Sequence, residues 1–79
     1  MDCFLTFDIG TTSVKTCVFD RSLRLLGHAN GEYRLLTERP GFVELEPETY
    51  WRAVLDGAKH AIAKAGVDAK QIVAISCTT

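Results

Sequence analysis

The fold is decided by residues 3–19, which read CFLTFDIGTTSVKTCVF. Two alternating apolar runs flank a short polar tip, and this pattern predicts two β-strands, about 3–8 and 14–20, joined in a hairpin. Asp8 closes the first run, so we expect its carboxylate where a buried sheet meets a cleft.

The tip of this hairpin carries residue types that bind phosphate. Gly10 can adopt a positive φ and lacks a side chain, so backbone amides can approach an oxyanion there. Thr11, Thr12 and Ser13 offer three hydroxyl donors. Asp8 would repel a bare phosphate and therefore implies a divalent cation between the two.

Lys15 follows the tip by two positions and shares one side of its strand with Ser13. This placement favours a phosphate contact over the competing interpretation of a solvated strand lysine. An ordinary hairpin turn competes for the tip as a whole, because Gly, Thr, Ser and Asp are common in turns. Residues 8–15 together favour the phosphate site, since a tight turn does not require three consecutive hydroxyls and then a lysine.

Length and charge limit the classes of function. At 79 residues the chain is at most one small domain of marginal stability, or a piece of a longer protein. A formal net charge of −1 indicates no general affinity for nucleic acid or an anionic membrane. The sequence shows neither a membrane-spanning run nor a signal peptide, so we expect a cytoplasmic protein.

The cysteines and histidines do not form a metal or redox motif. Cys3, Cys17 and Cys77 lie in apolar strand patterns without Cys-x-x-Cys spacing, and we expect reduced core residues. His28 and His60 are isolated, which favours surface or boundary positions over metal ligation.

The remaining chain predicts two more strands and one helix. Pro47 suits the first helical position and Gly66 a C-cap. The aromatic pair at 50–51 is interpreted as packing onto the sheet, with a ligand platform as the alternative. The other expected elements are a turn at 20–22, a strand at 24–36 with a bulge or coil at Gly27 and Gly31, a loop at 37–41, an edge strand at 42–45 and a strand at 72–77. The expected buried helix stripe comprises Trp51, Val54, Leu55, Ala58, Ile62 and Ala65.

Three antiparallel strands, a crossover helix and a parallel strand form an α/β unit. A right-handed crossover places the fourth strand beside the first, in the order 3-2-1-4, as in a ribonuclease H-like half-domain. Thr78 and Thr79 would then lie near the phosphate hairpin, or form a frayed polar terminus.

These residues resemble the N-terminus of the FGGY carbohydrate kinases. The shared segments are residues 7–15, 18–20, 40–44, 46–48, Trp51 and 72–75. The Asp-x-Gly-Thr hairpin occurs throughout the actin-like ATPase superfamily, whereas the Pro-Gly-aromatic-Val-Glu segment before a helix narrows the resemblance to this family.

The resemblance implies ATP- and Mg²⁺-dependent phosphorylation of a small-molecule sugar or polyol, in a cleft between two actin-like domains. By position, Asp8 would hold Mg²⁺, Gly10 to Ser13 would line the phosphates, and Lys15 would neutralise their charge. In this family the substrate-gripping pair, the general base and the adenine-binding domain come after residue 79. We therefore expect residues 1–79 to be a partial N-terminal domain that lacks a catalytic residue and is inert alone. For the longer parent protein, assembly into a homo-oligomer stays an open alternative.

Three alternatives stay open at this point. A chaperone-type ATPase of the same superfamily fits the hairpin almost as well. A ribonuclease H-type nuclease would pair Asp8 with Glu48 or Asp56, but residues 72–79 contain no acid to complete its metal site. The third alternative is a truncated, non-enzymatic module with an uncovered strand edge.

Overall fold

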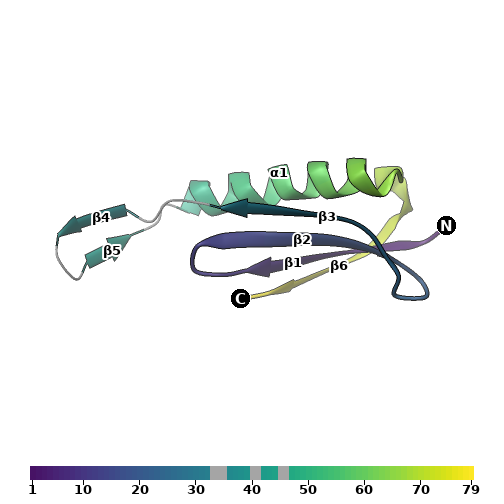
Figure 1. Cartoon of the computed structure of the whole chain (residues 1–79), viewed down its shortest axis with the longest axis horizontal. Helices are drawn as coiled ribbons and strands as arrows, with labels where there is room; N and C mark the ends of the chain where they lie inside the picture. The colour runs from purple at the N-terminus through teal and green to yellow at the C-terminus, as the bar shows by residue number, and fades with distance from the viewer. Residues whose placement is uncertain (33–35, 40–41, 45–46) are drawn as a thin grey trace.

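The computed structural model describes residues 1–32, 36–39, 42–44 and 47–79. Its main sheet has the strand order β3-β2-β1-β6, which confirms the predicted order 3-2-1-4. The three N-terminal strands are antiparallel, and β6 pairs with β1 in parallel. Figure 1 shows helix α1 lying along one face of this sheet. The strands are β1 (Cys3–Ile9), β2 (Ser13–Asp20), β3 (Leu25–Glu32) and β6 (Ile72–Thr78), and the helix is α1 (Pro47–Ala65).

A separate small hairpin projects beyond the end of the main sheet (Figure 1). It consists of β4 (Leu36–Arg39) and β5 (Phe42–Glu44). The short strand at 42–44 is confirmed. The third strand is described as far as Glu32, residues 33–35 lie outside the described residues, and Leu36, its expected last residue, belongs to β4. Residues 37–39, expected in a loop, belong to β4, because they pair with β5 instead of extending β3. The other expected loop residues, 40–41, and the end of the edge strand at 45 lie outside the described residues.

The helix packs over β2 and β3, and the core lies between these layers. Gly27 on β3 permits close contact, because a Cβ there would lie 2.5 Å from the Ala65 nitrogen and 2.6 Å from the Ala61 oxygen. The pairing of β2 with β3 skips a residue next to Gly27, as the predicted bulge requires. Among the residues whose burial is described, the buried apolar side chains are Cys3, Leu5, Phe7, Val14, Val18 and Ala61.

The predicted buried stripe of α1 is confirmed in part: Val54, Ala58, Ile62 and Ala65 pack against the core. Gly57 and Ala61 are its fully buried residues, whereas Trp51 is 60% exposed and Leu55 is 40% exposed. Small residues allow the helix backbone to approach the sheet most closely, so the helix turns this side inward and the large side chains lie at its edge. The expectation that Trp51 and Leu55 pack onto the sheet is therefore wrong for this structure.

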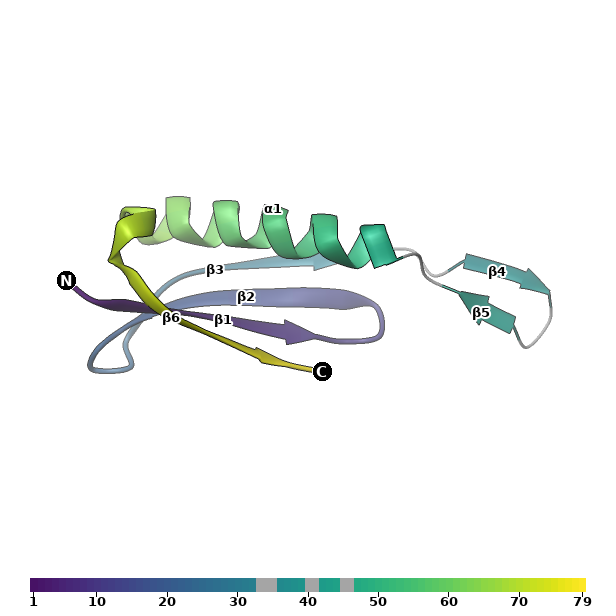
Figure 2. The ribbon, with the colours of Figure 1, turned by 180° about the vertical axis from the view of Figure 1, so that it is seen from behind.

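Strand β6 lies at the edge of the sheet, and α1 leaves it uncovered (Figure 2). All of its side chains beyond Ile72 are exposed, including Cys77. The expectation that Cys77 is a core residue is thus wrong, because the helix covers β2 and β3 instead. Cys3 is buried as expected, Cys17 is half-buried, and all three are free thiols.

The helix ends as its sequence predicts. Gly66 has a φ of +70°, and its N–H donates to the oxygens of Ile62 and Ala63 at 3.1 and 3.2 Å. A short 3₁₀ helix, Ala69–Gln71, follows and was missed in the link before β6. Its signal was an Asp-x-x-Gln capping box, in which Asp68 and Gln71 bond each other's backbone N–H groups.

His28 and His60 are both exposed, as predicted. In the part of the chain that the structure describes, no helix is both long and apolar enough to cross a membrane.

Candidate phosphate-binding site

The tip between β1 and β2 forms a closed, exposed turn. The two strands pair as far as Ile9 and Val14, and the Gly10 N–H donates to the Ser13 oxygen at 2.8 Å. Thr11 and Thr12 are exposed, and Ser13 is half-buried. The structure thus presents the three predicted hydroxyl residues together at one end of the sheet.

Gly10 does not use the positive φ that its sequence allows. Within the described chain, a positive φ occurs at Leu23 and Gly66. A Cβ at Gly10 would lie 3.4 Å from the Ser13 oxygen, at the tight limit of ordinary contact. The missing side chain is therefore what Gly10 contributes, because it leaves the space beside the Ser13 oxygen open.

Asp8 and Lys15 lie in one row across the sheet. They are register partners on β1 and β2, and Asp8 is also the partner of Thr78 on β6. Cys3, Leu5 and Phe7 alternate toward α1, so Asp8 and its partners lie on the opposite face. The fold thus brings together the predicted metal ligand and the predicted phosphate-binding cation.

The end of β6 reaches this row, as expected from the sequence. The Thr78 hydroxyl donates to Asp8 Oδ1 over 3.4 Å. Both views place the C-terminal end of β6 at the same end of the sheet as the hairpin tip (Figures 1 and 2). Thr78 therefore adds a polar contact to the site.

The oxygen donors of this site suit Mg²⁺. Carboxylate and hydroxyl oxygens are hard ligands, and Mg²⁺ commonly takes one or two carboxylates and completes its shell with phosphates and water. Among the residues the structure describes, no three His, Cys, Asp or Glu side chains gather into a metal-binding group. Glu48 and Asp56 lie on α1, across the sheet from Asp8, so the acidic set of the nuclease alternative is not assembled.

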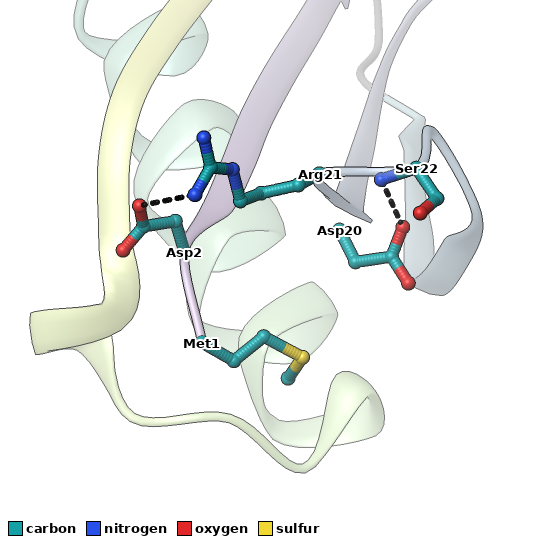
Figure 3. A pocket seen from close by; sticks show the side chains of 5 residues that line it. All are labelled: Met1, Asp2, Asp20, Arg21 and Ser22. Atoms are coloured by element: carbon teal, nitrogen blue, oxygen red, sulfur yellow. Dashed lines mark hydrogen bonds and ion pairs between the residues drawn. The ribbon is translucent and has the colours of Figure 1, made fainter.

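A second concave region is a pocket at the far end of the sheet. It is lined by Met1, Asp2, Asp20, Arg21 and Ser22 (Figure 3). Arg21 contacts the Asp2 carboxylate at 3.9 Å, and both side chains are largely exposed. Because Asp20 pairs with Cys3, this pocket lies at the opposite end of the strands from the hairpin tip.

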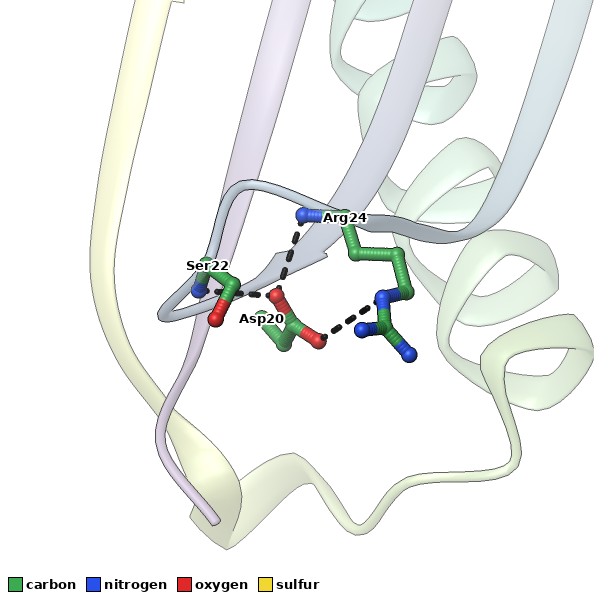
Figure 4. Close-up of polar contacts among 3 residues, drawn as sticks. All are labelled: Asp20, Ser22 and Arg24. Carbon is green, nitrogen blue, oxygen red and sulfur yellow. Dashed lines mark hydrogen bonds and ion pairs between the residues drawn. The ribbon is translucent and has the colours of Figure 1, made fainter.

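Asp20 organises the predicted turn between β2 and β3. Its Oδ1 accepts from the backbone N–H groups of Ser22 and Arg24 at 2.9 and 3.0 Å, and its Oδ2 lies 4.0 Å from Arg24 Nε (Figure 4). These contacts hold Leu23 at a φ of 62°, a conformation that favours glycine. Asp20 is therefore a structural residue of the turn.

Similar proteins agree with this geometry. The N-terminal domain model of the FGGY family of carbohydrate kinases matches residues 3–79. A glycerol kinase of Methylibium petroleiphilum is 41% identical over 78 residues, and glycerol kinase 2 of Thermotoga maritima is 38% identical over 78 residues. Each alignment covers 99% of this chain and 16% of the relative.

A solved structure shows the same fold. A xyloylose kinase from Brucella ovis superposes with a TM-score of 0.86 at 25% sequence identity, over 95% of this chain and 16% of that one. These findings favour the kinase interpretation over the chaperone-type ATPase. The chain spans about a sixth of the length of these relatives, and it belongs to the FGGY family of carbohydrate kinases, within their N-terminal domain.

Proposed function

We propose that this chain supplies the phosphate- and Mg²⁺-binding hairpin of an ATP-dependent kinase that phosphorylates a hydroxyl of a sugar or polyol. The observation that carries the proposal is the row of Asp8 and Lys15 beside the Gly10 to Ser13 tip. The family of the chain supports it, and the names of its relatives make glycerol the first substrate to test.

In this proposal each residue of the hairpin handles charge or position. Phosphoryl transfer requires mainly an in-line arrangement and stabilisation of charge on the phosphate oxygens. Asp8 would hold Mg²⁺, and the bound cation would supply positive charge that stabilises the phosphates. The Thr11 and Thr12 hydroxyls would donate to phosphate, and the Lys15 ammonium would balance its negative charge.

The proposal assigns no general base to this chain. Proton removal from the substrate hydroxyl and adenine binding would come from the rest of a complete kinase, so residues 1–79 alone would be inactive. A small-molecule substrate and a cytoplasmic location are part of the same proposal.

The test is Asp8→Asn in the complete kinase that carries this domain, because asparagine keeps the shape and removes the charge. We expect Mg²⁺-dependent transfer from ATP to glycerol or a sugar to fall by about 100-fold or more, with an unchanged circular dichroism spectrum. Asp2→Asn is the matched control, since Asp2 is exposed at the far end of the sheet. Full activity of the Asp8 variant would contradict the proposed metal role.

A further inference from the structure

The side chain of Asp8 has two polar neighbours in its row. Lys15 is its partner on β2 and Thr78 is its partner on β6. Opposite charges in such cross-strand positions commonly pair. Within the described residues, however, no ion pair of 4.0 Å or less joins Asp8 to Lys15, and the polar contact of Asp8 is with the Thr78 hydroxyl.

Thr78 lies beside Asp8 because of an irregularity in the pairing of β6 with β1. Cys3 pairs with Ile72, but Phe4 pairs with Ala74, so Val73 is skipped. Without the skip, the continuous register would place Cys77 opposite Asp8. The bulge at Val73 therefore brings a hydroxyl, and not a thiol, beside the carboxylate.

The contact is long for an O–H···O bond, which is usually 2.5 to 3.0 Å. The two atoms are nevertheless a matched donor and acceptor, because the Thr78 hydroxyl can donate and Asp8 Oδ1 accepts. A carboxylate held toward β6 in this way would not neutralise Lys15. The carboxylate and the ammonium can then act on a cation and a phosphate separately.

We propose that Thr78 is a positioning residue: its hydroxyl holds the Asp8 carboxylate toward β6, so that Asp8 binds Mg²⁺ while Lys15 stays available to phosphate. This inference rests on the proposed function and adds a residue to it. Loss of the hydroxyl lets Asp8 turn toward Lys15, which weakens both the cation contact and the phosphate contact.

The test uses the complete kinase with Thr78→Val, which keeps the β-branched shape, and Thr78→Ser, which keeps the hydroxyl. Ser76→Ala is the control, because Ser76 lies on the same strand and face but pairs with Thr6. Binding of Mn²⁺, as a spectroscopic substitute for Mg²⁺, is measured from the free-ion EPR signal in the presence of ATP. Steady-state kinetics at varied Mg²⁺ and ATP complete the set.

For Thr78→Val we expect about five-fold weaker Mn²⁺ binding, as for the loss of one hydrogen bond of about 1 kcal/mol. The Mg²⁺ concentration for half-maximal rate and the KM for ATP rise with it, while kcat at saturating Mg²⁺ changes less than about two-fold. Thr78→Ser restores all three values, and Ser76→Ala leaves them unchanged. A structural defect would instead lower kcat and the melting temperature together.

The outcomes separate this inference from the proposed function. An active parent in which Thr78→Val binds Mn²⁺ as well as wild type overturns the inference and leaves the function standing. Equal losses in the valine and serine variants also overturn it, because the hydroxyl is then not the cause. A parent without any Mg²⁺-dependent transfer overturns both. If Thr78→Val does not fold, Thr78→Ala is compared with Thr78→Ser by the same criteria.

Discussion

The contact between Gly57 and Thr16 should couple the helix to the sheet. Thr16 on β2 is fully buried, and its hydroxyl has no hydrogen-bond partner among the residues that the structure describes. A Cβ added at Gly57 would overlap the Thr16 hydroxyl oxygen and lie 3.3 Å from Thr16 Cβ. Gly57→Ala therefore inserts a methyl group into a filled contact.

The size of the effect follows from two opposing terms. Overpacking costs about 1 to 3 kcal/mol, whereas alanine is about 1 kcal/mol better than glycine inside a helix. The single variant Gly57→Ala should therefore lose up to about 2 kcal/mol of unfolding free energy. In a Thr16→Ala background the obstructing oxygen is gone, and the same change should stabilise the fold by about 1 kcal/mol.

A double-mutant cycle measured by urea unfolding, with far-UV circular dichroism as the probe, tests this coupling. We expect a favourable interaction energy of about 1 to 3 kcal/mol between the two substitutions. Thr16→Val is the matched control, because it removes the hydroxyl but keeps the volume. Thr16→Val alone should raise the unfolding free energy by about 1 kcal/mol or more, because it removes the unpaired hydroxyl. It should still fail to restore the stability lost in Gly57→Ala. Additivity within about 0.5 kcal/mol would refute the steric argument.

Three further predictions concern the β3 contact, the turn and the ligand. Gly27→Ala should lower the free energy of unfolding in urea by more than about 3 kcal/mol, since its Cβ would meet the helix backbone. Gly31→Ala has open space around it and should change this free energy by less than about 1 kcal/mol. Asp20→Ala should lower the unfolding free energy by about 1 to 2 kcal/mol through the loss of two backbone contacts, and Asp20→Asn, which keeps an acceptor, should lose less. Lys15→Gln should raise the KM for ATP in the complete kinase about ten-fold, and an unchanged KM would contradict its phosphate role.

The sequence predicted the architecture because its strongest signals are local. Alternating apolar residues defined β1 and β2, and Pro47 and Gly66 marked both ends of the helix. The chain order of these elements then left few ways to arrange a parallel fourth strand, so the strand order followed. The proximity of Asp8 and Lys15 is predictable from the alternation of side chains alone, since both residues lie on one hairpin.

The errors arose where tertiary packing overrides the local pattern. Large apolar residues suggested that Trp51 and Leu55 face the sheet, but close packing favoured the side with Gly57 and Ala61. The pairing of residues 36–39 with 42–44 depends on a partner strand that propensity does not reveal.

The alternation of side chains along β1 places the residues that stabilise this domain on one face of the sheet and the residues of the proposed site on the other. Leu5 and Phe7 face the helix, whereas Thr6 and Asp8 face the open side, so neighbouring residues of β1 serve different purposes. A shift of one residue in the pairing of β6 would reverse which of its side chains reach the Asp8 row. The bulge at Val73 sets this register, and no residue near it in the sequence is of a type that predicts a bulge. The position of Thr78 was therefore predictable only as proximity to the hairpin, while its contact with Asp8 required the structure. Substitutions on the helix face should accordingly change unfolding, and substitutions in the Asp8 row should change ligand binding at nearly constant stability.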